Sequence, residues 1–369
     1  MRTLVLGDLH LSSHTPKGVE LDLERLLGEH GGSRVVFAGD FFDLSADAGD
    51  GRPRDLASGF EAHPRAKAAL AKHVERDGEL VFLAGNHDPE IASVGDFFSS
   101  ARVRVSPWFF REGGLHVEHG HLYDPDNAPA HPLASARGTL GVHFVERFIA
   151  KTGAFAYLNA NDKTPLELFW NAFRWYGRRG PFVVYTYFEA AFAALAKSGR
   201  QWDGARDAER AEASLENFLA DAGVDEATAR ALMDERATPT MSSLRDTIAR
   251  LYLDRVTATV SIMAGLGAFA IGRRKLAAVL GAAGLAGLAY SWSRGHDRYG
   301  GKVPARLDAA ADRVRRAAGA DLVVFGHAHE IADRDGYANT ASFAFPRGVP
   351  GRPFLEIANG HAERRFLAT

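Results

Sequence analysis

The chain has 369 residues, of which 46% are hydrophobic and 24% charged, and this composition excludes wholesale disorder and fits two domains or one domain with a large insertion. The formal net charge of -2 gives neither the basic field typical of a nucleic-acid partner nor an acidic excess. Cysteine is absent, which excludes disulfides, thiolate zinc sites and cysteine nucleophiles, so any metal must be held by oxygen and imidazole ligands.

The first predicted element is a short buried strand at residues 4–6. It begins almost at the N-terminus and leaves no room for the charged and apolar regions of a signal peptide. We therefore expect the catalytic part to be cytoplasmic, with membrane association as an open alternative.

Four further apolar runs follow, each leading into a polar loop. They cover residues 35–38, 80–84, 115–118 and 322–325. Short runs rich in Val, Leu and Phe are typical of strands in the core of a sheet. Helix-like stretches such as residues 66–76 separate them, so the alternation predicts a layered α/β sheet fold.

Residues 125–316 differ from the rest of the chain, because Ala, Arg, Glu and Leu dominate and the short strands disappear. Helices are expected here at residues 167–176, 185–196, 205–222, 226–235 and 243–256. The segment is therefore predicted to be a helical insertion between the fourth and fifth polar loops.

Two uncharged stretches stand out inside that insertion. Residues 256–272 and 276–292 are separated only by the basic triplet at residues 273–275. Each would be roughly 25 Å long as a helix, which is short of the about 30 Å hydrocarbon core of a bilayer. Three interpretations stay open: a lipid-facing or interfacial hairpin, a hairpin buried in a soluble protein, and a spanning pair.

The loops that follow the five strands carry side chains that can bind metals. They are Asp8 and His10, then Asp40, then Asn86 with His87 and Asp88, then His119 with His121, and finally His327 with His329. In an extended segment alternate residues point the same way, so Asp8 with His10, and His327 with His329, can each reach one centre.

Carboxylate, amide and imidazole groups suit divalent metals such as Mn, Fe or Zn, and the two oxygens of Asp40 can bridge two ions. Two such ions favour hydrolysis of a phosphoester by a metal-bound hydroxide. His87 is the candidate acid for the leaving oxygen, because an imidazolium can deliver a proton near pH 7.

In order and spacing these loops resemble the motifs of calcineurin-like metallophosphoesterases. The stretch at residues 337–343 is similar to the strand and turn that close that fold. The resemblance implies a four-layer α/β/β/α core built from residues 1–124 and 317–369, with residues 125–316 as a helical cap that includes the apolar hairpin 256–292.

The resemblance also implies roles for individual side chains. One ion would lie on Asp8, His10, Asp40 and His329, and the other on Asp40, Asn86, His119 and His327. His87 would contact the phosphate, and Asp88 would hold His87 in place. His121 and Asp124 are candidates for substrate binding, with a hydrogen bond to a metal ligand as the alternative for His121.

Within that superfamily, residues 39–43 and 119–124 look like the UDP-2,3-diacylglucosamine hydrolase branch. Those enzymes cleave a pyrophosphate in a lipid A precursor, and an apolar helical insertion shelters its acyl chains. Here His87 stands where that branch usually has Arg, and His121 where it has Asp.

The expected function is therefore hydrolysis of a phosphoester or pyrophosphate, with a lipid-linked or nucleotide-linked substrate such as UDP-2,3-diacylglucosamine. Two divalent ions, preferably Mn, are the expected cofactors, and no nucleic-acid partner is expected. Peripheral membrane contact through residues 256–292 is an open alternative. The rival interpretations are a soluble nucleotidase, phosphodiesterase or protein phosphatase, and a non-enzymatic, metal-stabilised scaffold at the membrane.

Overall fold

The computed structural model describes residues 2–48, 55–155, 165–295, 302–358 and 360–368. Its strands are β1 (Thr3–Leu6), β2 (Arg34–Phe37), β3 (Glu79–Leu83), β4 (Val103–Ser106), β5 (Phe109–Glu112), β6 (Leu115–Glu118), β7 (Leu322–Phe325), β8 (Ala332–Arg334), β9 (Tyr337–Asn339), β10 (Gly351–Ala358) and β11 (His361–Ala368). The first helices are α1 (Gly18–Glu29), α2 (Leu56–Ala62), α3 (Pro64–Glu75), α4 (Leu140–Phe144) and α5 (Ala150–Thr152).

The remaining helices come from the middle of the chain, where the sequence predicts a helical insertion. They are α6 (Pro165–Tyr176), α7 (Gly180–Ala196), α8 (Gly204–Glu212), α9 (Leu215–Ala222), α10 (Glu226–Asp234), α11 (Leu244–Arg250), α12 (Leu253–Ala270), α13 (Arg274–Ser293) and α14 (Lys302–Ala318).

The chain divides into two compact units. One holds residues 1–153, 203–239 and 303–369, and includes both sheets together with α8, α9, α10 and α14. The other holds residues 154–202 and 240–302, and includes α6, α7, α11, α12 and α13.

Two sheets form the centre of the first unit. One has six strands in the order β11-β10-β1-β2-β3-β4, and β1, β2, β3 and β4 run parallel. The other has five strands in the order β5-β6-β7-β9-β8, and β6, β7 and β9 run parallel. Because these strands are short and mostly buried on both faces, they read in the sequence as continuous apolar runs.

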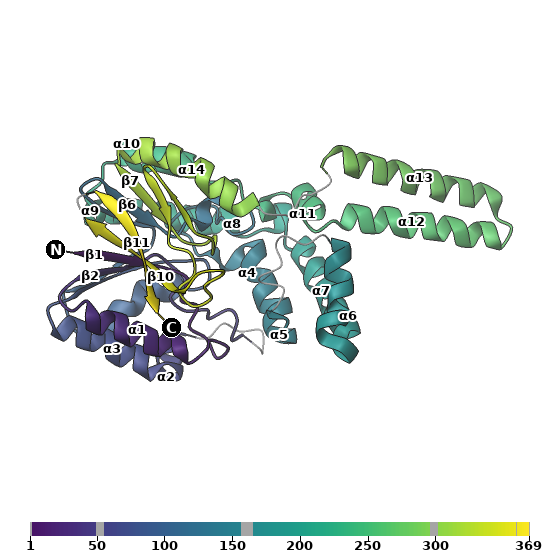
Figure 1. The fold of residues 1–369 in the computed structure, drawn as a ribbon. Coiled ribbons are helices and arrows are strands. Elements are labelled where there is room, and N and C mark those ends of the chain that lie inside the picture. Colours follow the sequence, from purple (N-terminus) through teal and green to yellow (C-terminus); the bar gives the residue numbers. More distant parts are fainter. Residues whose placement is uncertain (1, 49–54, 156–164, 296–301, 359, 369) are drawn as a thin grey trace. The chain divides into compact units, whose positions relative to one another are not determined.

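Alternate residues of each strand point to opposite faces, and this separates the core into three parts. In β1, Val5 joins the cluster between the two sheets, with Val117 and Val324 of the second sheet. Leu4 and Leu6 face the other way, against α1 and α3. The outer face of the second sheet packs on α9, α10 and α14, which Figure 1 shows beside β6 and β7.

Helix α1 shows why these layers form. Its buried side chains are Val19, Leu23, Leu26 and Leu27, which repeat at the spacing of one helical face. Helices outside two facing sheets make a four-layer α/β/β/α core, so the predicted fold class is confirmed.

Candidate metal centre

The candidate ligands come from loops at the carboxyl ends of parallel strands. Asp8 and His10 follow β1, Asp40 follows β2, and Asn86 follows β3. In the second sheet His119 follows β6, and His327 and His329 follow β7. The carboxyl ends of neighbouring parallel strands lie at one edge of a sheet, which is where open α/β sheets bind ligands.

Backbone hydrogen bonds connect these loops to one another. The amide of His10 donates to the carbonyl of Asp40 over 2.9 Å, which joins the loops after β1 and β2. The amide of Gly326 donates to the carbonyl of His119 over 3.0 Å, which joins the loops after β6 and β7. The amide of His327 donates to the carboxylate of Asp8 over 3.1 Å, which links the two sheets.

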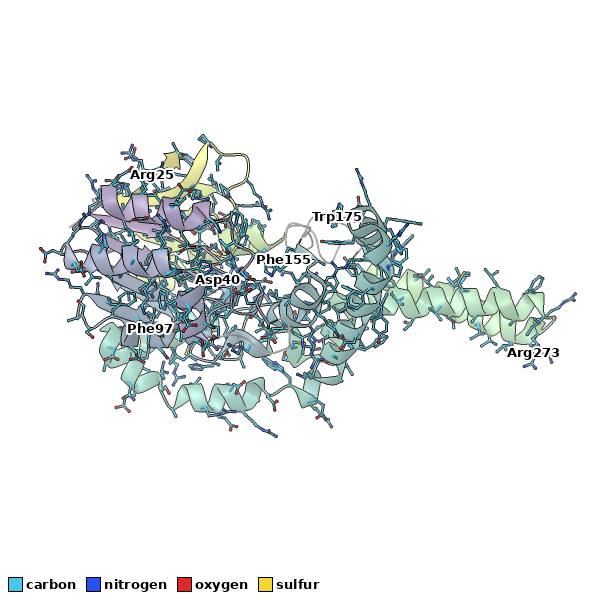
Figure 2. All side chains as sticks on the ribbon, turned by 90° about the horizontal axis from the view of Figure 1, so that it is seen from below. Arg25, Asp40, Phe97, Phe155, Trp175 and Arg273 are labelled. Atoms are coloured by element: carbon cyan, nitrogen blue, oxygen red, sulfur yellow. The ribbon has the colours of Figure 1, made fainter. Side chains whose placement is uncertain are left out.

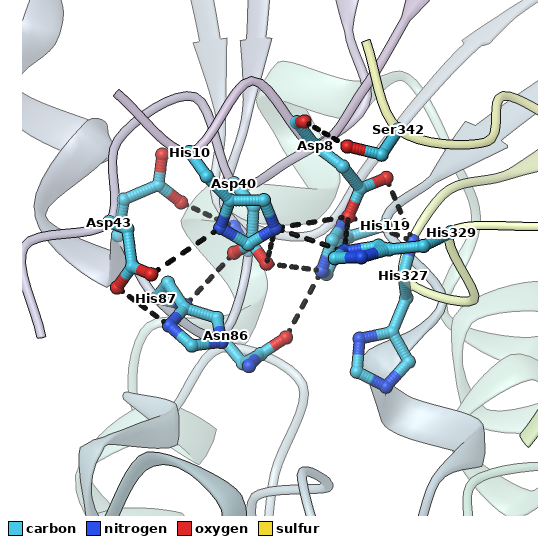
Figure 3. Close-up of polar contacts among 12 residues, drawn as sticks. Asp8, His10, Asp40, Asp43, Asn86, His87, His119, His327, His329 and Ser342 are labelled. Atoms are coloured by element: carbon cyan, nitrogen blue, oxygen red, sulfur yellow. Dashed lines mark hydrogen bonds and ion pairs between the residues drawn. The ribbon is translucent and has the colours of Figure 1, made fainter. Parts of the chain in front are cut away.

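The first group of candidate ligands contains Asp8, His10 and His329. Nε2 of His329 lies 3.1 Å from Oδ1 of Asp8 and 3.0 Å from Nε2 of His10 (Figure 3). The three groups each offer a ligand atom within 4.8 Å of the others. His10 and His329 are 319 positions apart in the chain, and the fold brings them together.

The second group is built around Asp40. Nε2 of His119 lies 3.2 Å from Oδ2 of Asp40 and 3.1 Å from Oδ1 of Asn86. Nδ1 of His119 lies 2.8 Å from the carbonyl of Ala38, so this nitrogen carries a proton, and Nε2 faces the two oxygens, where it can hold a second proton or, once deprotonated, a metal. The same Oδ2 of Asp40 lies 3.8 Å from Nε2 of His10, so Asp40 stands between the two groups.

His327 has a different neighbour from the other candidate ligands. Its Nε2 lies 3.1 Å from Oδ2 of Asp124, and its ring centroid is 5.2 Å from that of His119. Asp124 also accepts a hydrogen bond from Nδ2 of Asn127 over 2.7 Å and lies 3.7 Å from Arg306. The structure therefore places Asp124 against His327, and its expected contact with substrate stays a prediction.

His121 lies at the edge of this group, with its ring centroid 5.3 Å from that of His119. Burial and the neighbouring His119 lower the pKa of His121 well below its ordinary value, so this imidazole is neutral. Its Nδ1 atom is buried and has no hydrogen-bond partner among the described residues. Its role in substrate binding stays a prediction.

The carboxylate that holds His87 is Asp43. Oδ1 of Asp43 lies 2.9 Å from Nδ1 of His87, and Oδ2 lies 3.7 Å from Nδ1 of His10 (Figure 3). The expectation that Asp88 holds His87 is wrong, because the two oxygens of Asp88 accept from the amides of Phe42 and Gly85 over 3.1 and 3.0 Å. Asp88 thus fixes the loops after β2 and β3 relative to each other.

Asp43 is not among the candidate site residues that the sequence predicts, although the spacing in residues 39–43 indicates it. Asp40 and Asp43 are three residues apart in the loop after β2, and both carboxylates lie against the ring of His10, at 3.8 and 3.7 Å.

The electrostatics of the centre favour a cation. Asp8 and Asp40 are fully buried, and among the described residues their ion-pair partners are all histidines, with no Lys or Arg. Burial acts to lower the pKa of His119, but Asp40 overrides it and raises that pKa to about 9. A bound metal would take the place of this proton, because imidazole binds metals in its deprotonated form.

The donor set fits divalent metal ions. Two imidazole Nε2 atoms, from His10 and His329, face each other at 3.0 Å, and two neutral imidazoles in such contact share at most one proton. Converging lone pairs from carboxylate, amide and imidazole groups are the arrangement that borderline divalent ions such as Mn, Fe or Zn prefer.

The backbone of the centre is strained. Eight non-glycine residues among those described have a positive φ, and five of them are candidate ligands: Asp8, His10, Asp40, His327 and His329. Such conformations cost of order 1–3 kcal/mol each and cluster at functional sites, where the surrounding structure holds them. Backbone strain in the loops after β1 and β7 therefore identifies the same functional site as the candidate metal ligands do.

Gly85 leaves no room for a side chain beside Asp40. A Cβ atom on Gly85 would lie 2.0 Å from Oδ1 and 2.4 Å from the backbone nitrogen of Asp40. We expect Gly85→Ala to lower the free energy of unfolding by about 1–3 kcal/mol through overpacking, and to reduce bound metal by displacing Asp40. Urea denaturation and elemental analysis measure the two effects.

Gly28→Ala is the matched control, because Gly28 lies in α1 and a Cβ atom there meets no other atom within 4 Å. That change should leave metal content unaltered and stability equal or slightly higher, since alanine is the better helix former. Full metal content and unchanged stability in Gly85→Ala would contradict the packing described here.

A comparison with known protein families indicates the chemistry that these side chains perform. A family model for calcineurin-like phosphoesterases matches residues 1–185, about half of the chain, and this range includes the loops after β1, β2, β3 and β6. No curated protein matches the chain. The family match covers half of the chain, and the Asp and His side chains converge as metal binding requires. The chain therefore belongs to the calcineurin-like phosphoesterases, a family of metal-dependent phosphoester hydrolases.

Proposed function

We propose that this chain hydrolyses a phosphoester or pyrophosphate bond with two divalent ions, preferably Mn. The observation that carries the proposal is the position of Asp40, whose Oδ2 lies 3.2 Å from His119 and 3.8 Å from His10. A carboxylate between two groups of ligands is the arrangement that two ions about 3.5–4 Å apart require.

The candidate ligands divide into two sets that share Asp40. The first set adds Asp8, His10 and His329, and the second adds Asn86, His119 and His327. When bound, the two ions hold phosphoryl oxygens, activate water and offset the charge that develops on the departing oxygen. The side-chain amide of Asn86 is oriented so that its oxygen can bind an ion, because its Nδ2 donates to Asn127 over 3.3 Å and its Oδ1 faces His119.

His87 is proposed to deliver a proton to the leaving oxygen. Nδ1 of its ring is engaged by Asp43 at 2.9 Å, so Nε2 is the nitrogen available to substrate. A carboxylate on one nitrogen fixes the tautomer and the direction of the other. The backbone amide of His87 also donates to Oδ1 of Asp40 over 2.9 Å, which ties the proton donor to the centre.

The substrate is proposed to be lipid-linked or nucleotide-linked, with UDP-2,3-diacylglucosamine as the leading example. Support comes from residues 39–43 and 119–124, and from exposed apolar side chains in the helical segment between the loops of β6 and β7, including Trp170, Phe182 and Phe192. Aromatic and aliphatic surfaces of this kind suit acyl chains. His87 and His121 differ from the pattern of the diacylglucosamine branch, so other phosphoesters belong in the test of this proposal.

The experiment is a substrate panel assayed with and without Mn: diacylated UDP-sugar, nucleoside monophosphate, cyclic nucleotide, phosphopeptide and an aryl phosphate. We expect Mn-dependent turnover of the diacylated UDP-sugar at a kcat/KM at least about tenfold above the aryl phosphate, because the apolar portion adds binding energy. A preference for nucleoside monophosphate, cyclic nucleotide or phosphopeptide would instead identify the soluble nucleotidase, phosphodiesterase or protein phosphatase. Absence of Mn-dependent turnover on every member would support the scaffold interpretation.

A further inference from the structure

Helices α12 and α13 form a hairpin whose two backbones touch. A Cβ atom on Gly265 would lie 3.0 Å from the backbone nitrogen of Gly281, and one on Gly284 would lie 2.7 Å from the carbonyl of Ala258. Ser261 donates across the hairpin to the carbonyl of Leu280 over 2.8 Å. Close contact through small residues, with polar side chains bonded inside the pair, is how helices associate in lipid.

The outside of this hairpin, whose two helices are labelled α12 and α13 in Figure 1, is apolar and exposed. Val260, Met263 and Leu266 on α12 and Val279 and Leu285 on α13 each expose between 60% and 65% of their surface. Residues 256–272 and 276–292 contain no charged side chain that could give either helix a polar face. A helix that is apolar on all sides is stable when buried in protein or in lipid, and the described part of the chain does not bury this one.

Charged and aromatic residues lie only at the two ends of the hairpin. Arg273, which Figure 2 labels at the far end, is followed by Arg274 and Lys275. At the other end are Tyr290 and Trp292, residue types that prefer the boundary between lipid and water. Arg255 lies at that same end and donates to Ser291 and to the carbonyl of Gly295 over 3.0 and 2.8 Å.

The hairpin can reach across a bilayer when its basic ends are counted together with its uncharged stretches. By length and composition, α13 is the one helix among the described residues that is long and apolar enough to cross a membrane. The uncharged stretches span roughly 25 Å, and Arg and Lys side chains at their ends extend this reach toward the headgroups of an about 30 Å core. An interfacial helix would instead need a charged face along its length.

We propose that α12 and α13 insert into a phospholipid bilayer as a helical hairpin, with residues 273–275 in the headgroup layer of the far leaflet. Tyr290 and Trp292 then lie at the near boundary, and the small residues of both helices stay at their mutual contact. The proposal goes beyond the proposed function and does not depend on the substrate, since an enzyme held at a membrane can cleave soluble or lipid-linked phosphoesters.

The first test uses charge in the middle of the hairpin. The variant Met263→Glu/Leu285→Glu should reduce the fraction of protein that sediments with phosphatidylcholine–phosphatidylglycerol vesicles at least about tenfold, because both residues lie near the middle of their helices and a charge at the centre of a spanning helix is strongly unfavourable. Leu21→Glu is the matched control, as Leu21 is a half-exposed apolar residue on α1 of the other unit. It should sediment as the wild type does.

The second test determines depth, and the absence of cysteine makes it direct. When the protein is added to preformed sealed vesicles, so that every molecule approaches from outside, an impermeant maleimide should label Leu21→Cys, leave Leu285→Cys unlabelled until detergent is added, and reach Ile271→Cys only when the vesicles are made leaky. Labelling of Ile271→Cys from outside would overturn the spanning arrangement. Loss of Mn-dependent turnover alone would bear on the proposed function and leave this proposal intact.

Self-association is the other way to cover the apolar surface. If the wild type stays in solution as an oligomer and does not sediment with vesicles, and the double Glu variant is a monomer, the hairpin binds a second copy of the chain and the proposal is wrong.

Discussion

Asp40→Asn is expected to reduce kcat/KM on any phosphoester that the chain hydrolyses by at least about 1,000-fold, which corresponds to about 4 kcal/mol of lost transition-state stabilisation. Asp40 is the carboxylate between the two groups of ligands, and its Oδ1 also accepts the backbone amide of His87. Asparagine preserves the shape but removes the negative charge that two cations would share.

Metal content gives an independent measurement of the same change. Elemental analysis should find two divalent ions in each wild-type chain and fewer in Asp40→Asn. The matched control is Asp77→Asn, because Asp77 is also an aspartate with positive φ, lies in the same unit, and is exposed far from the candidate ligands. Asparagine tolerates this backbone conformation well, so folding should be preserved in both variants.

The catalytic assignment of Asp40 fails if Asp40→Asn keeps activity within about tenfold of the wild type with its metal content intact. Full activity of wild-type protein that contains no divalent ion would also contradict it.

His87→Gln is expected to reduce turnover by about 100- to 10,000-fold on substrates whose leaving oxygen needs a proton, such as an alkyl phosphate. The effect on an aryl phosphate should be much smaller, because a phenolate leaves without full protonation. The comparison of the two substrates separates a proton donor from a residue that only binds phosphate. Equal losses on both would show that His87 acts through binding alone.

Asp43→Asn is the companion variant. Its carboxylate contacts Nδ1 of His87 at 2.9 Å, and removal of a carboxylate that orients a functional histidine typically lowers activity by about 10- to 100-fold. We expect the loss to follow the same dependence on the leaving group as in His87→Gln, and the double variant to be little worse than His87→Gln alone, since both act on one proton. Additive losses would mean that Asp43 acts independently of His87.

Local patterns in the sequence determined the layered sheets and the candidate ligands. Short apolar runs predict buried parallel strands because those strands are covered on both faces, and polar residues directly after them identify the edge where a site forms. Asp8, Asp40, Asn86, His119 and His327 could be chosen in this way because each follows such a run. The same reasoning located the uncharged stretches of α12 and α13, since the absence of charge is visible without any fold.

Contacts between distant loops were decided only by the tertiary structure. Asp43, and not Asp88, is the partner of His87 because of how the loops after β2 and β3 pack together. The sequence alone does not distinguish the two carboxylates, since each lies in a loop that carries candidate ligands. Backbone strain at Asp8 and His327 and the 3.0 Å approach of His10 to His329 depend likewise on packing between residues 319 positions apart. Exposure of the hairpin was equally undetermined, because an apolar helix has the same sequence whether protein or lipid covers it.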